Sequence, residues 1–310
     1  MIELVSQLLI LAVSLVALAF FSHFTISSIE RLIELTGLSE ASAGFVILAV
    51  MTSTPEIIIA VFSVLEGTPG ISIGDIVGSN VFNVGAVVGI LGMLGYLKTC
   101  CTDLLVELTD ILFLTSLIPL LLVIFQVASP LIGFVLLGTF VVAVYFMAKR
   151  KTPAVAATKS IVAEKRNGKM VAARLILGMS VVIVSARLVV SSGLNIADAL
   201  GVAPILVGAK VVAIGTSLPE LSLDLVAVRR GRVQLAIGDI LGSNLTNLTL
   251  VLGLVLVSSP FAVDMTIFTE ILPFLLITTV IFWRFLTKGG VSQVGGIVLI
   301  MVYILFQAII

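Results

Sequence analysis

Two glutamates, Glu56 and Glu220, lie inside long apolar stretches of the chain and share the same polar neighbours. Each follows a threonine by four residues and a serine by three, and each comes directly after a proline. On a helix, this spacing puts both hydroxyl groups on the face of the carboxylate. Carboxylate and hydroxyl oxygens are ligands that hard cations accept in proteins. The pattern therefore predicts a cation site.

The same pattern is part of a longer internal repeat. Residues 49–89 and 213–253 align without a gap at an offset of 164, and 17 of the 41 positions are identical. Because a polar set is duplicated within apolar sequence, we expect a site that is built twice, with the two copies face to face. The identical positions include Thr52/Thr216, Ser53/Ser217, Pro55/Pro219, Glu56/Glu220, Gly74/Gly238, Asp75/Asp239, Gly78/Gly242, Ser79/Ser243, Asn80/Asn244 and Asn83/Asn247.

The repeat supplies further oxygen ligands besides the glutamates. Pro55 and Pro219 cannot donate a hydrogen bond to the carbonyl four residues back, so the carbonyls of Met51 and Gly215 lose their helical partners. The set lacks imidazole and thiolate, which favours Ca²⁺ and Na⁺ over Zn²⁺ or Cu²⁺ as the bound ion. No cofactor is expected. The candidate metal ligands are Met51, Thr52, Ser53, Glu56, Ser79, Asn83, Gly215, Thr216, Ser217, Glu220, Ser243 and Asn247.

Composition places this site in a membrane. Of the 310 residues, 60% are hydrophobic and 11% charged, with 17 basic and 17 acidic residues giving a net charge of zero. Such a chain is solvated mostly by lipid, and nothing in its charge indicates nucleic acid; no protein partner can be inferred. The only cysteines, Cys100 and Cys101, are neighbours and form no disulfide framework. The first apolar run is interpreted as a retained helix and not a signal peptide.

Hydropathy predicts an all-α polytopic membrane protein of ten spans. These are residues 3–22, 42–65, 71–96, 104–126, 130–148, 170–190, 203–227, 233–257, 265–286 and 291–309. The only long connection divides the chain into two five-helix halves, residues 1–148 and 170–310, joined by a basic linker at 149–169.

Basic residues predict the orientation. Fifteen of the 17 Lys and Arg residues lie in or beside the odd-numbered connections, and only Arg187 and Lys210 lie toward the other face. The protein is expected in the plasma membrane. The positive-inside rule then puts the odd connections, including the 149–169 linker, on the cytoplasmic side. Both termini are then extracellular. The two halves cross the membrane in opposite senses, which is typical of the inverted repeats of secondary transporters.

Depth explains why the glutamates need a partner. Both fall near the middle of their predicted spans, where a charged side chain costs about 3 kcal/mol. No Lys, Arg or His lies at that depth in the same spans, so we expect a cation from solution to balance them.

The remaining ionisable residues are expected to play smaller parts. Asp75 and Asp239 could be vestibule acids that attract cations or helix-end residues, and the sequence leaves both open. Interfacial or structural roles are expected for Glu107, Asp110, Asp224 and Glu270, and the single histidine, His23, is expected to be interfacial. The basic linker is expected to contact lipid head groups.

The two copies resemble the alpha-repeats of the cation/calcium exchanger superfamily. Residues 215–220 match its G-T-S-L-P-E hallmark, residues 51–56 depart from it at two positions, and both are followed by a G-(N/D)-x-x-G-S-N-x-x-N pattern. The resemblance covers the whole chain and implies that the side-chain ligands named above line the ion sites. Sodium/calcium exchangers of this family commonly carry an acidic residue where Asn247 stands, so two central carboxylates are expected here and not three.

These observations predict an antiporter that exchanges Ca²⁺ for Na⁺ by alternating access. The nearest alternative is a proton/calcium exchanger, in which protonation of the glutamates replaces Na⁺ binding. A cation channel is disfavoured because the glutamates occur once per half and not as a ring. An enzyme is disfavoured because no histidine, cysteine or metal-ligand cluster accompanies the glutamates.

Overall fold

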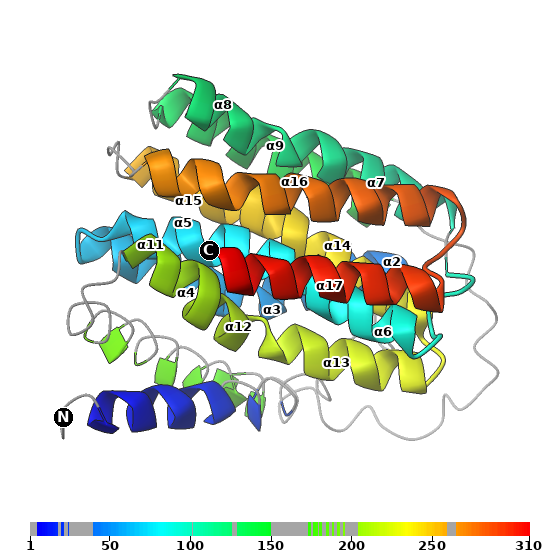
Figure 1. Cartoon of the computed structure of the whole chain (residues 1–310), viewed down its shortest axis with the longest axis horizontal. Helices are drawn as coiled ribbons and strands as arrows, with labels where there is room; N and C mark the ends of the chain where they lie inside the picture. The colour runs from blue at the N-terminus through cyan, green and yellow to red at the C-terminus, as the bar shows by residue number, and fades with distance from the viewer. Residues whose placement is uncertain are drawn as a thin grey trace.

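The computed structural model describes residues 5–17, 20–21, 24, 40–100, 102–125, 129–149, 173–174, 176–178, 180–181, 184–185, 188, 191–192, 195, 204–258 and 265–310. All regular structure among them is helical, and the helices run side by side along the long axis of the molecule (Figure 1). His23, most of the 149–169 linker and much of the expected spans at 3–22 and 170–190 lie outside the described residues.

The internal repeat is reproduced element by element. The first half contains α2 (Glu40–Ala43), η1 (Gly44–Leu48), α3 (Ala49–Thr52), α4 (Thr54–Leu65), α5 (Pro69–Phe82), η2 (Asn83–Val88) and α6 (Gly89–Met93). The second half contains α11 (Pro204–Val207), η3 (Gly208–Val212), α12 (Ala213–Thr216), α13 (Leu218–Arg229), α14 (Val233–Thr246), η4 (Asn247–Val251) and α15 (Leu252–Ser258). The η elements are π-helical turns, and each stands at the same place in both halves.

Outer helices cover this repeated centre. They are α7 (Asp103–Ser116), α8 (Ile118–Phe125), α9 (Pro130–Lys149), α16 (Met265–Thr287) and α17 (Gln293–Ile309). The expected span at 104–126 is not one continuous helix, because it is interrupted at Leu117, two residues before Pro119. A proline two residues on removes a backbone donor and favours such a break.

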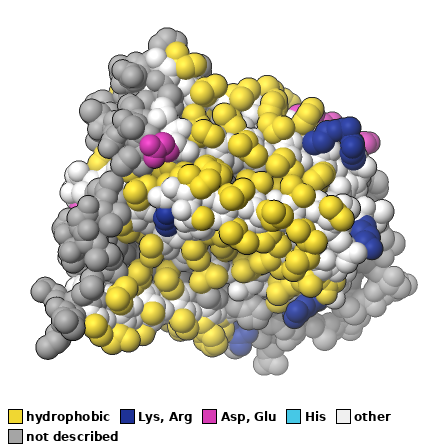
Figure 2. Space-filling model, viewed as in Figure 1, with side chains coloured by type: hydrophobic (Ala, Val, Ile, Leu, Met, Phe, Trp, Pro, Cys, Tyr) yellow, Lys and Arg dark blue, Asp and Glu magenta, His cyan; other side chains and the backbone are white. Residues whose placement is uncertain are grey.

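Several helices are long and apolar enough to cross a membrane. Among the described residues there are five, at 69–93, 130–147, 205–229, 233–258 and 269–287, and the pair 44–52 and 54–65, which is bent by 45°, adds a sixth if it counts as one span. On the face that Figure 2 shows, hydrophobic side chains cover most of the middle of the molecule, and most of the basic side chains lie toward one end. The chain therefore has the surface of an integral membrane protein.

The two halves pack into each other at their centres. The π turn η1 packs on α14 of the other half, and η3 packs on α5. Glycines allow the close approach: a Cβ on Gly44 would lie 3.0 Å from the Asp239 nitrogen, and one on Gly208 would lie 3.0 Å from the Asp75 nitrogen. Small residues at such crossings let helix backbones meet. Each half thus places its first π turn beside an aspartate of the other half.

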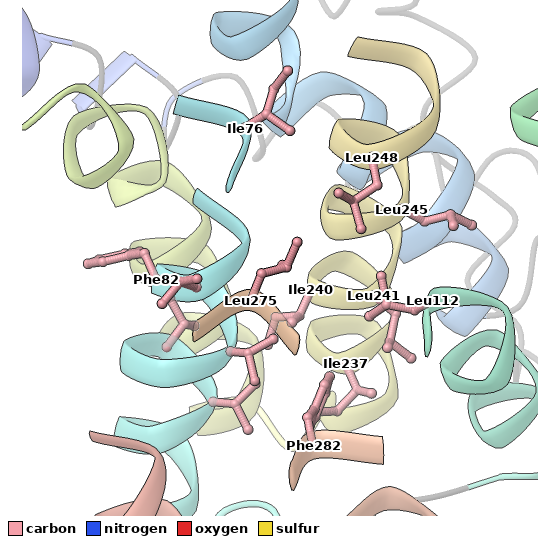
Figure 3. Packing of buried hydrophobic residues seen from close by; sticks show 14 of the residues in the cluster. Ile76, Phe82, Leu112, Ile237, Ile240, Leu241, Leu245, Leu248, Leu275 and Phe282 are labelled. Carbon is pink, nitrogen blue, oxygen red and sulfur yellow. The ribbon is translucent and has the colours of Figure 1, made fainter. Parts of the chain in front are cut away.

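Apolar side chains surround this crossing. Ile237, Leu241 and Leu245 on α14 pack toward Leu112 of α7 and Phe282 of α16 (Figure 3). The side chains in this cluster are buried. The polar residues of the repeat therefore sit inside an apolar shell, where each unpaired oxygen is costly.

Candidate functional site

The site lies where two helices are broken. The first break separates α3 from α4 at Ser53, with a bend of 45° between the segments 44–52 and 54–65. The second separates α12 from α13 at Ser217. In each case a proline is the second residue of the following helix, so it supplies no backbone donor to the turn before it.

The freed carbonyls behave differently in the two halves. The Ser53 N–H donates to the Ala49 oxygen, and a backbone N–H at this break donates to the Met51 oxygen, so the Met51 carbonyl is not left without a donor as the sequence predicted. At the matching position, Gly215 packs against the Leu15 side chain of the N-terminal helical segment. A glycine there leaves room for that leucine, whereas Met51 supplies its own side chain.

Each break presents a threonine to the opposite half. The Thr52 hydroxyl lies 3.3 Å from Asp239 Oδ1, to which it donates, and 3.0 Å from the Ser243 hydroxyl. The Thr216 hydroxyl lies 3.0 Å from Asp75 Oδ1 and 3.4 Å from the Ser79 hydroxyl. The predicted pairing of the two copies face to face is therefore seen in these hydrogen bonds.

Both glutamates are fully buried at the centre of this arrangement. Glu220 Oε1 accepts a hydrogen bond from Ser243 at 3.4 Å, while Glu220 Oε2 and both oxygens of Glu56 have no hydrogen-bond partner in the protein. The charged groups that act on Glu56 are Glu220 and Asp75, which are both acidic. No positive side chain of the described residues forms an ion pair with either glutamate.

The asparagines join the two halves at the same level. Asn83 Nδ2 donates to Asn244 Oδ1 at 3.0 Å, which links η2 to α14. The Asn247 side chain is buried, and neither its oxygen nor its nitrogen has a partner. The hydroxyls of Ser53 and Ser217 are also buried without one. All the predicted side-chain ligands are thus buried around the two breaks.

Three aspartates play a larger part in the buried cluster than the sequence predicted. Asp75 and Asp239 are fully buried and accept hydrogen bonds from the site threonines, so they belong to this cluster and not to a helix end at the interface. Of the interfacial or structural role expected for Asp224, the interfacial alternative is wrong, because its carboxyl is fully buried against that of Asp239. The repeat contained the signal for Asp75 and Asp239, since both stand in its Gly-Asp pair.

Glu107, Asp110 and Glu270 lie outside the buried cluster. All three are exposed, and Asp110 accepts a hydrogen bond of 2.7 Å from the Trp283 indole.

The arrangement can bind a cation that several kinds of oxygen share. In the described part of the chain, no three acidic, histidine or cysteine side chains converge on one metal position. Hydroxyl, amide and carbonyl oxygens therefore have to complete any coordination shell around the glutamates, as hard cations allow. A buried carboxylate without a donor or a counter-charge is strongly unfavourable, and a bound cation relieves that cost.

Fold and site together define a membrane protein of the cation-transporter class. The sequence profile of the family described as sodium/calcium exchanger protein matches residues 6–149 and 170–310, so the chain belongs to this family. Members of the family are transporters of calcium and a second cation.

Individual relatives agree with that assignment. The chain is 26% identical to the sodium/calcium exchanger MaX1 of Methanosarcina acetivorans, with 97% of each chain covered. It is 26% identical to the inner membrane protein YrbG of Escherichia coli, over 89% of this chain and 88% of that one. A solved structure of the sodium-calcium exchanger NCX_Mj, soaked with Na⁺ and Sr²⁺, superimposes with a TM-score of 0.74 at 25% identity and covers 100% of this chain and 99% of its own.

Proposed function

We propose that this protein exchanges Ca²⁺ for Na⁺ across the membrane by alternating access, with the Glu56 and Glu220 carboxylates at the centre of the ion site. The observation that carries the proposal is the burial of both carboxylates among hydroxyl and amide oxygens, with no basic side chain acting on either. The names of MaX1 and NCX_Mj, which are sodium/calcium exchangers, support the same pair of ions.

Competition for two negative charges couples the ion fluxes. One Ca²⁺ balances two carboxylates, and so do two Na⁺, whereas an empty site leaves buried charge uncompensated. The protein therefore changes its access state only when it is loaded. Thr52, Ser53, Ser79 and Asn83 serve as neutral ligands from the first half. The Met51 carbonyl already accepts a backbone hydrogen bond and contributes its second lone pair. Gly215, Thr216, Ser217, Ser243 and Asn247 serve as neutral ligands from the second half.

The proposed topology has ten spans in two inverted halves, 1–148 and 170–310, with the 149–169 linker in the cytoplasm and both termini outside. The asymmetry of basic residues supports it. A single cysteine at Asn167 will react with an impermeant thiol reagent only from the cytoplasm, and one at Asn195 only from outside. Cys100 and Cys101 have to be replaced first. Labelling of both positions from the same side would show that the halves are not oppositely oriented.

The test of the exchange is ⁴⁵Ca²⁺ uptake into proteoliposomes under an imposed Na⁺ or pH gradient. We expect uptake that follows an outward Na⁺ gradient, saturates, and stops when Na⁺ is replaced by choline on both sides. Uptake that follows an outward proton gradient without Na⁺ would instead show proton/calcium exchange. That second function is favoured by one observation, the five buried carboxyls of the centre, which offer places for protons. Uptake without any counter-ion would indicate a channel.

Asn247 provides a test of the ligand set. Its buried amide has no partner in the protein, so we expect it to contribute its oxygen to the ion. Asn247→Leu should lower Ca²⁺ flux by about 5- to 150-fold, because an unmade buried ligand costs about 1 to 3 kcal/mol. Asn247→Asp should stay active with a stronger pH dependence of Ca²⁺ affinity, since a third carboxylate opposes joint ionisation. Flux against pH at fixed Na⁺ measures both, and normal flux in Asn247→Leu would exclude the residue from the site.

A further inference from the structure

The two halves differ in the partner of one repeated serine. Ser79 and Ser243 are equivalent in the repeat, and each stands four residues after an aspartate on the same helix. Ser79 donates a hydrogen bond to Oδ1 of that aspartate, Asp75, at 3.3 Å. Ser243 instead donates to Glu220 Oε1 at 3.4 Å. The same hydroxyl therefore serves an aspartate in the first half and a central glutamate in the second.

The two aspartates differ in a matching way. Asp75 and Asp239 each accept a hydrogen bond from the threonine of the opposite half. The second partner of Asp75 is Ser79, whereas the second partner of Asp239 is the carboxyl of Asp224. Each aspartate thus has two side-chain partners. In the second half Asp224 takes the place that a serine has in the first.

The sequence explains why only the second half has this partner. The helices α13 and α14 pack on each other as an antiparallel pair and bring Asp224 against Asp239. The residue of α4 that matches Asp224 is Ala60, whose side chain has no donor. Asp75 therefore has to take its second hydrogen bond from elsewhere, and Ser79 of its own helix supplies it.

A hydrogen bond between two carboxyls needs a proton on one of them. Both side chains are fully buried, and apart from this bond no group of the described residues donates to either oxygen of Asp224. Asp239 already accepts a hydrogen bond from Thr52, which favours its ionised form. The charged groups that act on Asp224 are Asp239 and Glu220, so an ionised Asp224 would add a third negative charge. Asp224 is therefore the donor of the pair.

We propose that Asp224 is a positioning residue, which donates to Asp239 and thereby leaves Ser243 free to turn toward the ion site. The Ser243 hydroxyl then holds Glu220 in place. Glu56, whose two oxygens have no partner in the protein, is held by the ion alone. The inference rests on the proposed role of Glu220 in Ca²⁺ binding, and it adds a residue that acts on the site without touching the ion.

The test measures Ca²⁺ affinity. Binding of ⁴⁵Ca²⁺ to the purified full-length protein is followed by scintillation proximity, in Na⁺-free choline buffer at constant pH. Asp224→Ala copies the residue of the first half, so Ser243 should turn to Asp239. Ca²⁺ affinity should then fall about tenfold, because a hydrogen bond to a charged group is lost. Asp224→Asn should bind as the wild type does, because its amide still donates. Glu270→Gln, which removes an exposed carboxyl, is the matched control.

A second substitution shows whether Asp224 acts through Ser243. Ser243→Ala removes the hydroxyl that Asp224 is proposed to release. If the two residues act in one chain, Asp224→Ala should cost little further Ca²⁺ affinity in the Ser243→Ala protein, so the two effects are not additive. A general loss of packing around Asp224 would lower the affinity by the same factor in both backgrounds.

Three results would overturn the proposal. Unchanged affinity in Asp224→Ala would show that the residue has no influence on the site. An equal loss in Asp224→Asn would assign the effect to charge and not to the hydrogen bond. The same loss with and without Ser243 would place the effect on another route. If Asp224→Ala does not elute as a single species, Asp224→Val, which fills more of the space and also lacks a donor, takes its place.

The outcome also separates this inference from the proposed function. A wild-type protein that binds no Ca²⁺ would contradict the proposed exchange, and with it this inference, which depends on it. A wild type that binds Ca²⁺ and gives any of the three results above would contradict the role of Asp224 alone.

Discussion

Replacing Glu220 with glutamine will abolish Ca²⁺ transport while the protein stays folded. The side chain is fully buried, and one of its carboxylate oxygens has no hydrogen-bond partner in the protein. Removing one partner of a buried charge interaction costs about 2 to 5 kcal/mol, so Ca²⁺ affinity should fall by more than about 30-fold. Folding is expected to survive, because an uncompensated buried carboxylate does not stabilise the protein. Glu56→Gln should behave in the same way, since both Glu56 oxygens lack a partner.

The measurement is the Ca²⁺ dependence of ⁴⁵Ca²⁺ uptake, with elution from a size-exclusion column as the check on folding. Glu270→Gln serves as the control because Glu270 is exposed and distant in sequence from the repeat. Near-normal uptake in either central variant would remove that glutamate from the ion site. Loss of uptake in the control would show that the assay responds to something other than the site.

Replacing Gly208 with valine will prevent stable folding. A Cβ at this position would lie 3.0 Å from the backbone nitrogen of Asp75 and would collide with the carbonyl oxygen of Ile71. Overpacking costs about 1 to 3 kcal/mol where side chains can adjust, and here the obstacle is the backbone of α5. We therefore expect at least the upper end of that range, seen as a large loss of monodisperse protein in detergent and a lower thermal midpoint.

Gly138 offers the matched control for this substitution. It lies in α9 and is exposed, and a Cβ there would meet nothing within 4 Å. Gly138→Val should leave the yield and the midpoint unchanged. Equal damage from both substitutions would mean that valine in these helices is harmful in general, and the contact between η3 and α5 would then explain nothing.

The repeat predicted most of the site because polar residues inside a membrane have few other roles than to face one another or a bound ion. Thr52 and Thr216 were placed beside their glutamates by helical spacing alone, and the structure adds that each also reaches an aspartate of the other half. That second contact could not be predicted, since it depends on how α5 and α14 cross the opposite half. Gly44 and Gly208 decide this crossing, and the sequence does not say which helix a small residue will meet.

Asp224 was missed for a related reason. Counting residues along a span gives the depth of a side chain but not the direction in which it points, so a carboxylate far from the span centre was given an interfacial or structural role and no place in the site. Burial of Asp224 follows from the hairpin formed by α13 and α14, whose turn at Gly231 has a φ of 77°. The break at Leu117 in the span 104–126 had a visible cause in Pro119, whereas hydropathy averages across such a break.

The π turns determine where these helices can lose a single residue without disturbing the site. A π turn holds one residue more than an α turn, so deleting a residue inside η2 or η4 would let the helix continue as α without rotating the segments on either side. The same deletion within α5 or α14 would rotate every following residue by about 100° and shift it by about 1.5 Å. Single-residue gaps between relatives in these helices should therefore gather at 83–88 and 247–251, where Asn83 and Asn247 begin the turn. A gap elsewhere in the helix would turn the ion ligands away from one another.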